Sequence, residues 1–134
     1  MEIIDEGRCF VCGNENEHGL RLSFTSENGR TVSEFTLQKY FQGYKDIIHG
    51  GIISAILDEA MIHAAVSEKL SPVTAEITVR FKQPLSVGRP AMVIAELTNK
   101  GPRLIEARAR LSDRTSGALI AEATGKLIPL KEYP

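Results

Sequence analysis

The sequence predicts an α+β domain in which one long helix covers one face of an antiparallel sheet of five or six strands. Helix-compatible residues fill positions 52–66, between a Gly-Gly pair and a Leu-Ser-Pro run that mark the two ends of the helix. Several other segments alternate apolar and polar residues, as half-buried strands do. The links at 99–102 and 113–117 are short and rich in turn residues, which predicts hairpins between consecutive strands.

Two strands precede the helix. Residues 20–25 alternate apolar and polar side chains and predict the first strand, and residues 31–37 predict the second. Residues 27–30 read Glu-Asn-Gly-Arg, a turn sequence that lies between them. Residues 40–48 predict the loop that leads into the helix.

The helix itself is apolar nearly all round. At about 100° per residue, one face is formed by Ile53, Ile56, Leu57, Ala60 and Ala64. The opposite face carries Ser54, Asp58, Met61, Ile62 and Ala65. Such a helix is usually buried, so Asp58 becomes a covered carboxylate whose pKa is raised by desolvation. Glu59 and His63 have i,i+4 spacing, which predicts a structural pair on one side of the helix.

Four strand segments follow with no helix between them, at residues 76–82, 91–98, 104–111 and 118–128. The first segment places Ile77, Val79 and Phe81 on one face. The third places Ile105, Ala107, Ala109 and Leu111 inward and Glu106, Arg108 and Arg110 outward. Short turns between consecutive strands predict an antiparallel meander, which completes a single domain over residues 1–134.

The composition excludes several classes of function. The 134 residues are 43% hydrophobic and 25% charged, as in an ordinary globular protein. The net charge of −1 and the lack of a basic cluster argue against a nucleic-acid partner. No apolar run reaches the length of a membrane span, and residues 1–6 lack the basic start and apolar core of a signal peptide. We therefore expect a cytoplasmic protein with no membrane partner.

Cys9 and Cys12 form a single C-x-x-C motif, which supplies only half of a tetrahedral zinc site. His18 or a second subunit would have to complete the site. A redox pair would require a βαβ context and a cysteine near a helix N-terminus, and the sequence indicates neither. We expect a packed N-terminal turn here, with no metal and no cofactor.

The start of the helix is the best candidate for a reactive site. Gly50 and Gly51 bring bare backbone N–H groups, at the positive end of the helix dipole, close to a bound ligand. Asp58 follows on the same helix and supplies either proton transfer or a nucleophile, although a rim acid with a hydrogen-bond partner would show the same spacing. This outlines a site that attacks a carbonyl group, and no G-x-S-x-G motif or phosphate-binding glycine loop competes with it.

Several motifs occur in a recognisable order. Residues 9–13 read Cys-Phe-Val-Cys-Gly and are followed by Asn16 and by Gly19-Leu20. Phe41-Gln42-Gly43 precedes His49-Gly50-Gly51, Asp58 lies nine residues after His49, and Thr74 follows the helix. In this order and spacing the chain resembles the hotdog-fold thioesterases, in particular the phenylacetyl-CoA-type branch of acyl-CoA thioesterases.

The resemblance implies hydrolysis of an acyl-CoA or related thioester. It makes Asp58 the general base or nucleophile and places the oxyanion hole at the N–H of Gly50 or Gly51. It further implies that His49 orients the loop or the thioester and that Thr74 positions water or the carboxylate. Gln42 lies near a position where some relatives carry a polar amide.

The resemblance also implies a place for the nucleotide end of coenzyme A, on the outer strand face and the following hairpin. Arg80, Lys82 and Arg103 fit those positions, although each alone reads as a solvated residue. Two other functions stay open at this point. One is a hotdog hydratase or dehydratase, in which the histidine itself transfers the proton, and the other is a non-catalytic acyl-CoA-binding module.

The spacing of the reactive groups predicts an assembly. Gly51 and Asp58 are seven residues apart, which puts their backbones about 10 Å apart along one helix. An oxyanion donor must lie about 3 Å from the oxygen that it stabilises. The donor and the acid of one straight helix are therefore too far apart to act on the same carbonyl group. We therefore expect a homodimer, or two such dimers paired into a homotetramer, in which each site is shared between chains. Met61, Ile62 and Ala65 would then line the dimer contact or the pocket wall.

Overall fold

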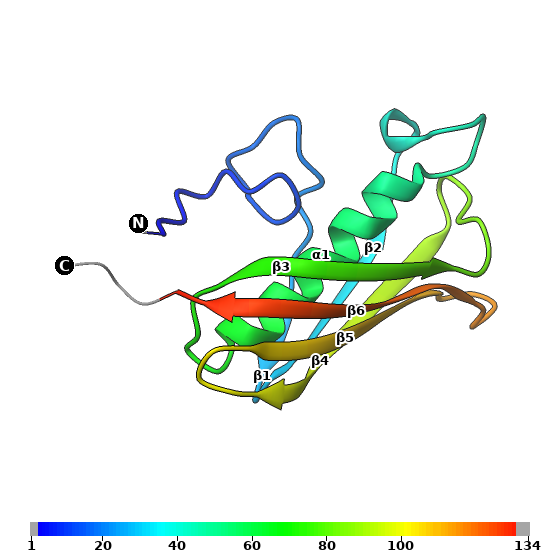
Figure 1. Ribbon diagram of the computed structural model, residues 1–134. Helices are drawn as coiled ribbons and strands as arrows, with labels where there is room; N and C mark the ends of the chain where they lie inside the picture. Colours follow the sequence, from blue (N-terminus) through cyan, green and yellow to red (C-terminus); the bar gives the residue numbers. More distant parts are fainter. Residues whose placement is uncertain (1–2, 131–134) are drawn as a thin grey trace.

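The structure is a computed structural model that describes residues 3–130 (Figure 1). Its elements in chain order are β1 (Thr25–Glu27), β2 (Arg30–Thr36), the 3-10 helix η1 (Lys39–Phe41), α1 (Gly50–Val66), β3 (Pro72–Phe81), β4 (Pro90–Lys100), β5 (Ile105–Asp113) and β6 (Leu119–Pro129). The expected domain limits at residues 1 and 134 lie outside the described residues, so the single domain over 1–134 stays a prediction.

The six strands form one antiparallel sheet in the order β1-β2-β4-β5-β6-β3, and α1 lies across one face of it (Figure 1). This confirms the α+β class and the single long helix. The predicted meander is correct for β4, β5 and β6 but wrong for β3, which pairs with β6 at the sheet edge. The link from β3 to β4 is too long for a hairpin. It passes the loop before α1, where the Ile48 N–H donates to the Leu85 carbonyl oxygen at 2.9 Å.

The predicted apolar face of α1 is the centre of the core. All five residues expected on that face are buried, namely Ile53, Ile56, Leu57, Ala60 and Ala64. Met61 and Ala65 are also completely buried, so the expectation that they line a dimer contact or pocket wall was wrong. The side chain of Met61 packs on β6 where Gly125 leaves space, since a Cβ there would lie 2.9 Å from the Met61 methyl carbon. Ile62 stays half-buried.

The first hairpin forms at the predicted turn, but the strand before it is shorter than predicted. Asn28 and Gly29 adopt positive φ angles of 50° and 79°, as a two-residue turn of type I′ requires. Residues 20–24 do not join the sheet, and Arg21 takes a φ of 53°, which lies outside the strand region. Backbone bonds from the Leu20 and Leu22 N–H groups attach this segment to residues 10 and 11 of the N-terminal turn.

The strand β3 is one of the two edges of the sheet, and it is much longer than β1 at the other edge. Within the described chain β6 pairs with one side of β3, and no strand pairs with the other. β3 has 10 residues, and Val73 and Phe81 on it are 38% and 56% exposed. Its pairing with β6 is interrupted by a bulge between Thr74 and Glu76. An edge of this length with exposed apolar residues is suited to pairing with another strand.

Among residues 3–130, no helix combines the length and the hydropathy that a membrane crossing requires.

Candidate active site

The N-terminus of α1 presents one unused backbone donor. His49 is the N-cap residue, and its Nδ1 accepts a hydrogen bond of 2.8 Å from the Gly51 N–H. Because this bond occupies the Gly51 donor, Gly51 does not offer it to a ligand in this conformation. The Gly50 N–H donates to no protein group in the described part of the chain, as expected in a first helical turn. Of the two glycines predicted as oxyanion donors, Gly50 is the available one.

Asp58 and Thr74 meet where α1 crosses the first residues of β3. The Thr74 hydroxyl donates to Oδ1 of Asp58 at 2.6 Å, and both side chains are half-buried. The bulge is responsible for this contact. Ile77 and Val79 face the helix, so regular alternation would turn Thr74 to the outer face, and the extra residue restores it to the inner one.

The carboxyl group of Asp58 is held in an unfavourable setting for its charge. Burial raises the pKa of Asp58, the Thr74 hydroxyl opposes that rise, and the negative charge of Glu59 adds to it. The net result is a raised pKa, as predicted from the apolar surroundings on the helix. A partly desolvated carboxylate with one positioned donor is a suitable general base or nucleophile.

Gly50 and Asp58 are not brought together within one chain. They are eight residues apart on α1, or about 12 Å along its axis. A side chain at Gly50 would lie 3.5 Å from the ring of Phe81, at one end of β3, whereas Asp58 contacts Thr74 near the other end. The two halves of the predicted site therefore lie at opposite ends of the edge strand.

Gln42 supports the loop before the helix. Its side-chain oxygen accepts a bond of 2.9 Å from the Asp46 N–H. Its backbone pairs with Ile48, directly before His49. The substrate-binding role implied for Gln42 stays a prediction, and the contact that the structure gives it is with the loop.

The three predicted phosphate contacts do not cluster in one chain. Arg80 lies at the C-terminal end of β3, Lys82 directly follows the strand, and Lys82 is 3.8 Å from Glu122 on β6. Arg103 lies in the β4–β5 hairpin, beside Ile105, which pairs with Leu127 at the Thr74 end of the sheet. The residues that pair with Ile105 and with Arg80 are five apart on β6, which is about 17 Å. The three residues are therefore too far apart to meet one ligand end within a single chain, and their phosphate-binding role stays a prediction.

A hollow of about 680 Å³ lies on the outer face of the sheet, and Arg80, Arg108 and Arg110 are among its lining residues. It includes neither Asp58 nor Thr74 nor Gly50. We do not assign the reaction to this hollow, because the groups that can act on a carbonyl lie on the opposite face.

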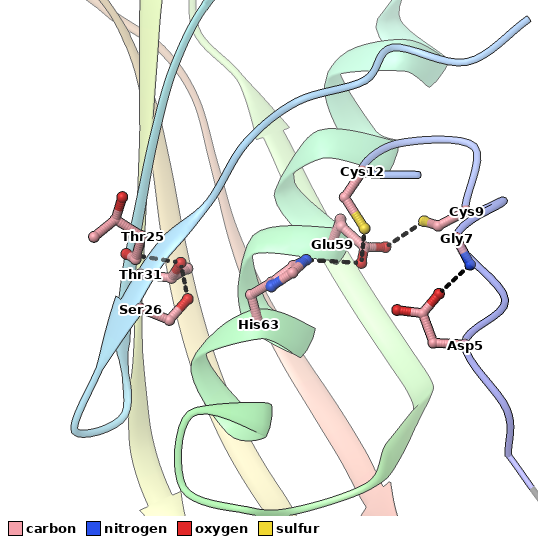
Figure 2. A network of polar contacts seen from close by, with 9 residues as sticks. All are labelled: Asp5, Gly7, Cys9, Cys12, Thr25, Ser26, Thr31, Glu59 and His63. Carbon is pink, nitrogen blue, oxygen red and sulfur yellow. Dashed lines mark hydrogen bonds and ion pairs between the residues drawn. The ribbon is translucent and has the colours of Figure 1, made fainter. Parts of the chain in front are cut away.

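One cluster was not predicted. The thiols of Cys9 and Cys12 both donate to the carboxylate of Glu59, with Sγ to oxygen distances of 3.4 and 3.5 Å (Figure 2). The predicted pair of Glu59 with His63 is also present at 3.3 Å. Burial by itself raises the pKa of Glu59, but the hydrogen bond and charge of His63 and the two thiols lower it below its usual range. Burial, followed by the charge of Glu59, raises the pKa of Cys12. The separations of 50 and 47 residues explain why sequence spacing gave no signal.

Comparison with known proteins identifies the family. A sequence profile described as the thioesterase superfamily matches residues 45–120, which is more than half of the chain and includes Gly50, Asp58 and Thr74. The chain belongs to the thioesterase superfamily.

A curated relative is similar over most of the chain. The mouse (Mus musculus) protein acyl-coenzyme A thioesterase THEM4 is 29% identical over 101 residues, covering 75% of this chain and 44% of the mouse protein. The chain spans about half the length of the curated THEM4 relatives that it matches.

Solved structures show the same fold. A hypothetical thioesterase from Streptococcus pneumoniae, solved with coenzyme A, has a TM-score of 0.79 at 14% identity and covers 84% of this chain and 88% of its own. The Escherichia coli PaaI protein from the phenylacetic acid degradation operon has a TM-score of 0.76 at 21% identity, covering 81% and 83%. These structural matches confirm the predicted fold.

The raised pKa of Asp58 leads to a prediction about stability. Folding disfavours its ionised form, so Asp58 destabilises the folded state increasingly as the pH rises above its unfolded pKa of about 3.9. Asp58→Asn removes the charge and keeps an acceptor for Thr74. We expect this variant to melt at a higher temperature than the wild type near neutral pH, and the difference to disappear toward about pH 4. Thermal melts across this range test the prediction, and a lower melting temperature at neutral pH would contradict it.

Proposed function

We propose that this chain hydrolyses acyl-CoA thioesters to a free acid and coenzyme A. The observation that carries the proposal is the half-buried Asp58, held by the Thr74 hydroxyl on the helix whose first N–H, at Gly50, has no protein partner. Membership of the thioesterase superfamily supports it. So does the name of the mouse relative, an acyl-coenzyme A thioesterase.

The chemistry assigns one task to each group. The ionised Asp58 either removes a proton from the attacking water or attacks the thioester carbonyl itself. Thr74 holds the carboxylate in position through its 2.6 Å bond. The Gly50 N–H stabilises the oxyanion that develops on the carbonyl oxygen, a contribution of about 3 kcal/mol for one backbone or side-chain donor.

The tautomer of His49 favours hydrolysis over the hydratase and dehydratase reactions. Nδ1 of His49 accepts from the Gly51 N–H, so a neutral ring carries its proton on Nε2. Such a ring donates toward a ligand and is not poised to remove a proton from it. We assign His49 the orienting role, which it performs by capping the helix start.

We further propose that the working site is shared between two copies of the chain. The edge strand β3 offers the means, because two copies can pair there antiparallel about a twofold axis. The Phe81 end of one β3 then meets the Thr74 end of the other. Gly50 lies at the first end and Asp58 at the second, so the pairing joins the two halves of the reaction site.

The same pairing restores the expected nucleotide site. It turns the end of β3 with Arg80 and Lys82 in one copy toward the end with Arg103 in the other. Three cations from two chains would then be available for the phosphates of coenzyme A.

The acid can be tested by a single substitution. We expect Asp58→Asn to lower kcat by about a hundredfold or more while the fold is retained, because the amide neither accepts a proton nor attacks a carbonyl. Steady-state hydrolysis of a panel of acyl-CoA thioesters, followed by detection of free thiol, measures the effect and identifies the preferred acyl group.

Asp46→Asn is the matched control. Asp46 is an exposed loop residue with a φ of 62°, a conformation that Asn also tolerates, and we expect kcat to be unchanged. Normal hydrolysis by Asp58→Asn would show that the acid is wrongly assigned.

The phosphate contacts predict a specific change in KM. Charge reversal by Arg80→Glu with Lys82→Glu should raise KM for an acyl-CoA substrate and leave KM unchanged for a short thioester that lacks the nucleotide. Arg114→Glu is the control, since Arg114 lies in the β5–β6 hairpin with Glu34 as its partner. Equal effects on both substrates would indicate a structural role for the two cations.

A mixing experiment tests the shared site. Gly50 is the first helical residue, where proline is tolerated, and His49 has φ −59° and ψ 133°, which suit a residue before proline. Gly50→Pro therefore removes the N–H donor without breaking the helix, whereas Gly50→Ala keeps it. We expect Gly50→Pro and Asp58→Asn chains, each inactive alone, to recover roughly a quarter of wild-type activity after exchange, because half of the dimers are hybrids with one intact site of two.

Two controls accompany the mixture. Gly50→Ala should retain activity, because its added Cβ meets Phe81 only at ordinary contact distance. If hybrid dimers form and the mixture remains inactive, each chain builds its own site and the shared arrangement is wrong.

A further inference from the structure

The N-terminal turn and the second half of α1 bring four metal-binding side chains together. Cys9 and Cys12 come from the turn, and Glu59 and His63 come from successive turns of α1 (Figure 2). The ligand atoms of Cys9, Cys12 and Glu59 all lie within 4.8 Å of one another. The proposed reaction uses none of these four residues.

The distances from the other three donors to the Glu59 carboxylate are those between neighbouring ligands of a small ion. Bonds of about 2.0–2.3 Å at tetrahedral angles hold two ligand atoms of a zinc site about 3.3–3.8 Å apart. The two sulfur–oxygen separations to Glu59 are 3.4 and 3.5 Å, and Nε2 of His63 is 3.3 Å from Oε1 of Glu59. Cys12 and His63 make these distances to Oε1 and Cys9 makes its distance to Oε2, so each of the three donors lies within ligand range of the Glu59 carboxylate.

The fold arranges the donors in advance. The turn that carries the thiols is closed by a 2.9 Å bond from the Gly13 N–H to the Cys9 carbonyl oxygen. It admits only glycine at position 13, since a Cβ would lie 2.4 Å from the Cys9 nitrogen. On the helix, the ring of His63 stacks on Phe24, with ring centroids 4.3 Å apart, so Nε2 points toward Glu59.

The electrostatics of the cluster are also those of a cation site. The Glu59 and His63 side chains are only 18% and 28% exposed. Among the described residues, no lysine or arginine forms an ion pair with Glu59. A largely covered carboxylate beside two thiols is the kind of group that proteins pair with a metal.

We propose that Cys9, Cys12 and Glu59, whose ligand atoms lie close together, bind one zinc ion that fastens the N-terminal turn to α1, and that His63, which pairs with Glu59, supplies the fourth ligand. Two sulfur ligands, one nitrogen and one carboxylate oxygen form a closed tetrahedral set with no position left for water or substrate, which is the character of a structural site. This ion is separate from the proposed hydrolysis, since Asp58 points to β3 and Glu59 to the N-terminal turn.

Cobalt and zinc titrations of the full chain, kept reduced with a non-thiol reductant, test this site. We expect one Co²⁺ per chain, with the visible bands of tetrahedral cobalt and a thiolate-to-cobalt charge-transfer band that Zn²⁺ abolishes. Zinc removal should lower the melting temperature of the wild type, because the ion stabilises only the folded chain.

The variants identify the ligands. Cys9→Ser with Cys12→Ser should abolish the charge-transfer band, and Glu59→Gln or His63→Gln should each weaken zinc affinity by about tenfold or more. His18→Gln and Asp58→Asn are the matched controls and should bind zinc as the wild type does. Circular dichroism establishes that each variant is folded. The titration of the wild type tests metal binding even if a variant does not fold.

Three results would overturn the site. They are a reduced wild-type chain without the charge-transfer band, a His63→Gln variant with undiminished affinity, and a purified chain that holds a Cys9–Cys12 disulfide and no zinc. The last result would show that the pair is redox-active or simply oxidised. None of these results bears on thioester hydrolysis, so the two proposals fail separately.

Discussion

The rotation of α1 about its own axis is the constraint on which the rest of this structure depends. Seven helix residues are buried, and their packing fixes which side of the helix faces the sheet. With that face fixed, successive residues 58 and 59 point in different directions, one toward β3 and the other toward the N-terminal turn. The hydrophobic core therefore determines where the polar chemistry occurs.

The two neighbouring acids show how strongly their surroundings differ. Asp58 has one hydroxyl donor and a raised pKa, whereas Glu59 has a histidine and two thiols and a lowered one. The raised pKa of Asp58 indicates a carboxylate that accepts a proton readily. The lowered pKa of Glu59 indicates a carboxylate that is stabilised as an anion and can bind a cation. Adjacent positions on a helix, about 100° apart around its axis, are sufficient to separate these two environments.

Local patterns in the sequence predicted the parts of the structure that depend on local chemistry. The apolar spacing of α1, the Asn28-Gly29 turn and the inward residues of β5 were predicted because periodicity and turn geometry act over a few residues. The place of β3 beside β6 was missed because pairing across the sheet depends on the path of a long link. The role of Thr74 in positioning water or the carboxylate came from the family resemblance, while the bulge that turns its side chain to the helix leaves no mark in the alternation pattern. The contact of the cysteines with Glu59 requires the folded N-terminal turn, and no spacing of residues in the sequence indicates it.

The bulge in β3 also links local order to the reactive group. Thr74 lies on an edge strand that has a ladder on one side only, at the point where even that ladder is interrupted. Such a stretch has fewer backbone bonds to break than the central strands, so it opens at a lower free energy than they do. Each opening would release the hydroxyl that holds Asp58. The amide protons around Thr74 would then exchange with solvent sooner than those of β5. Any contact that covers this edge would slow that exchange, and it would also keep the Asp58 carboxylate in its position.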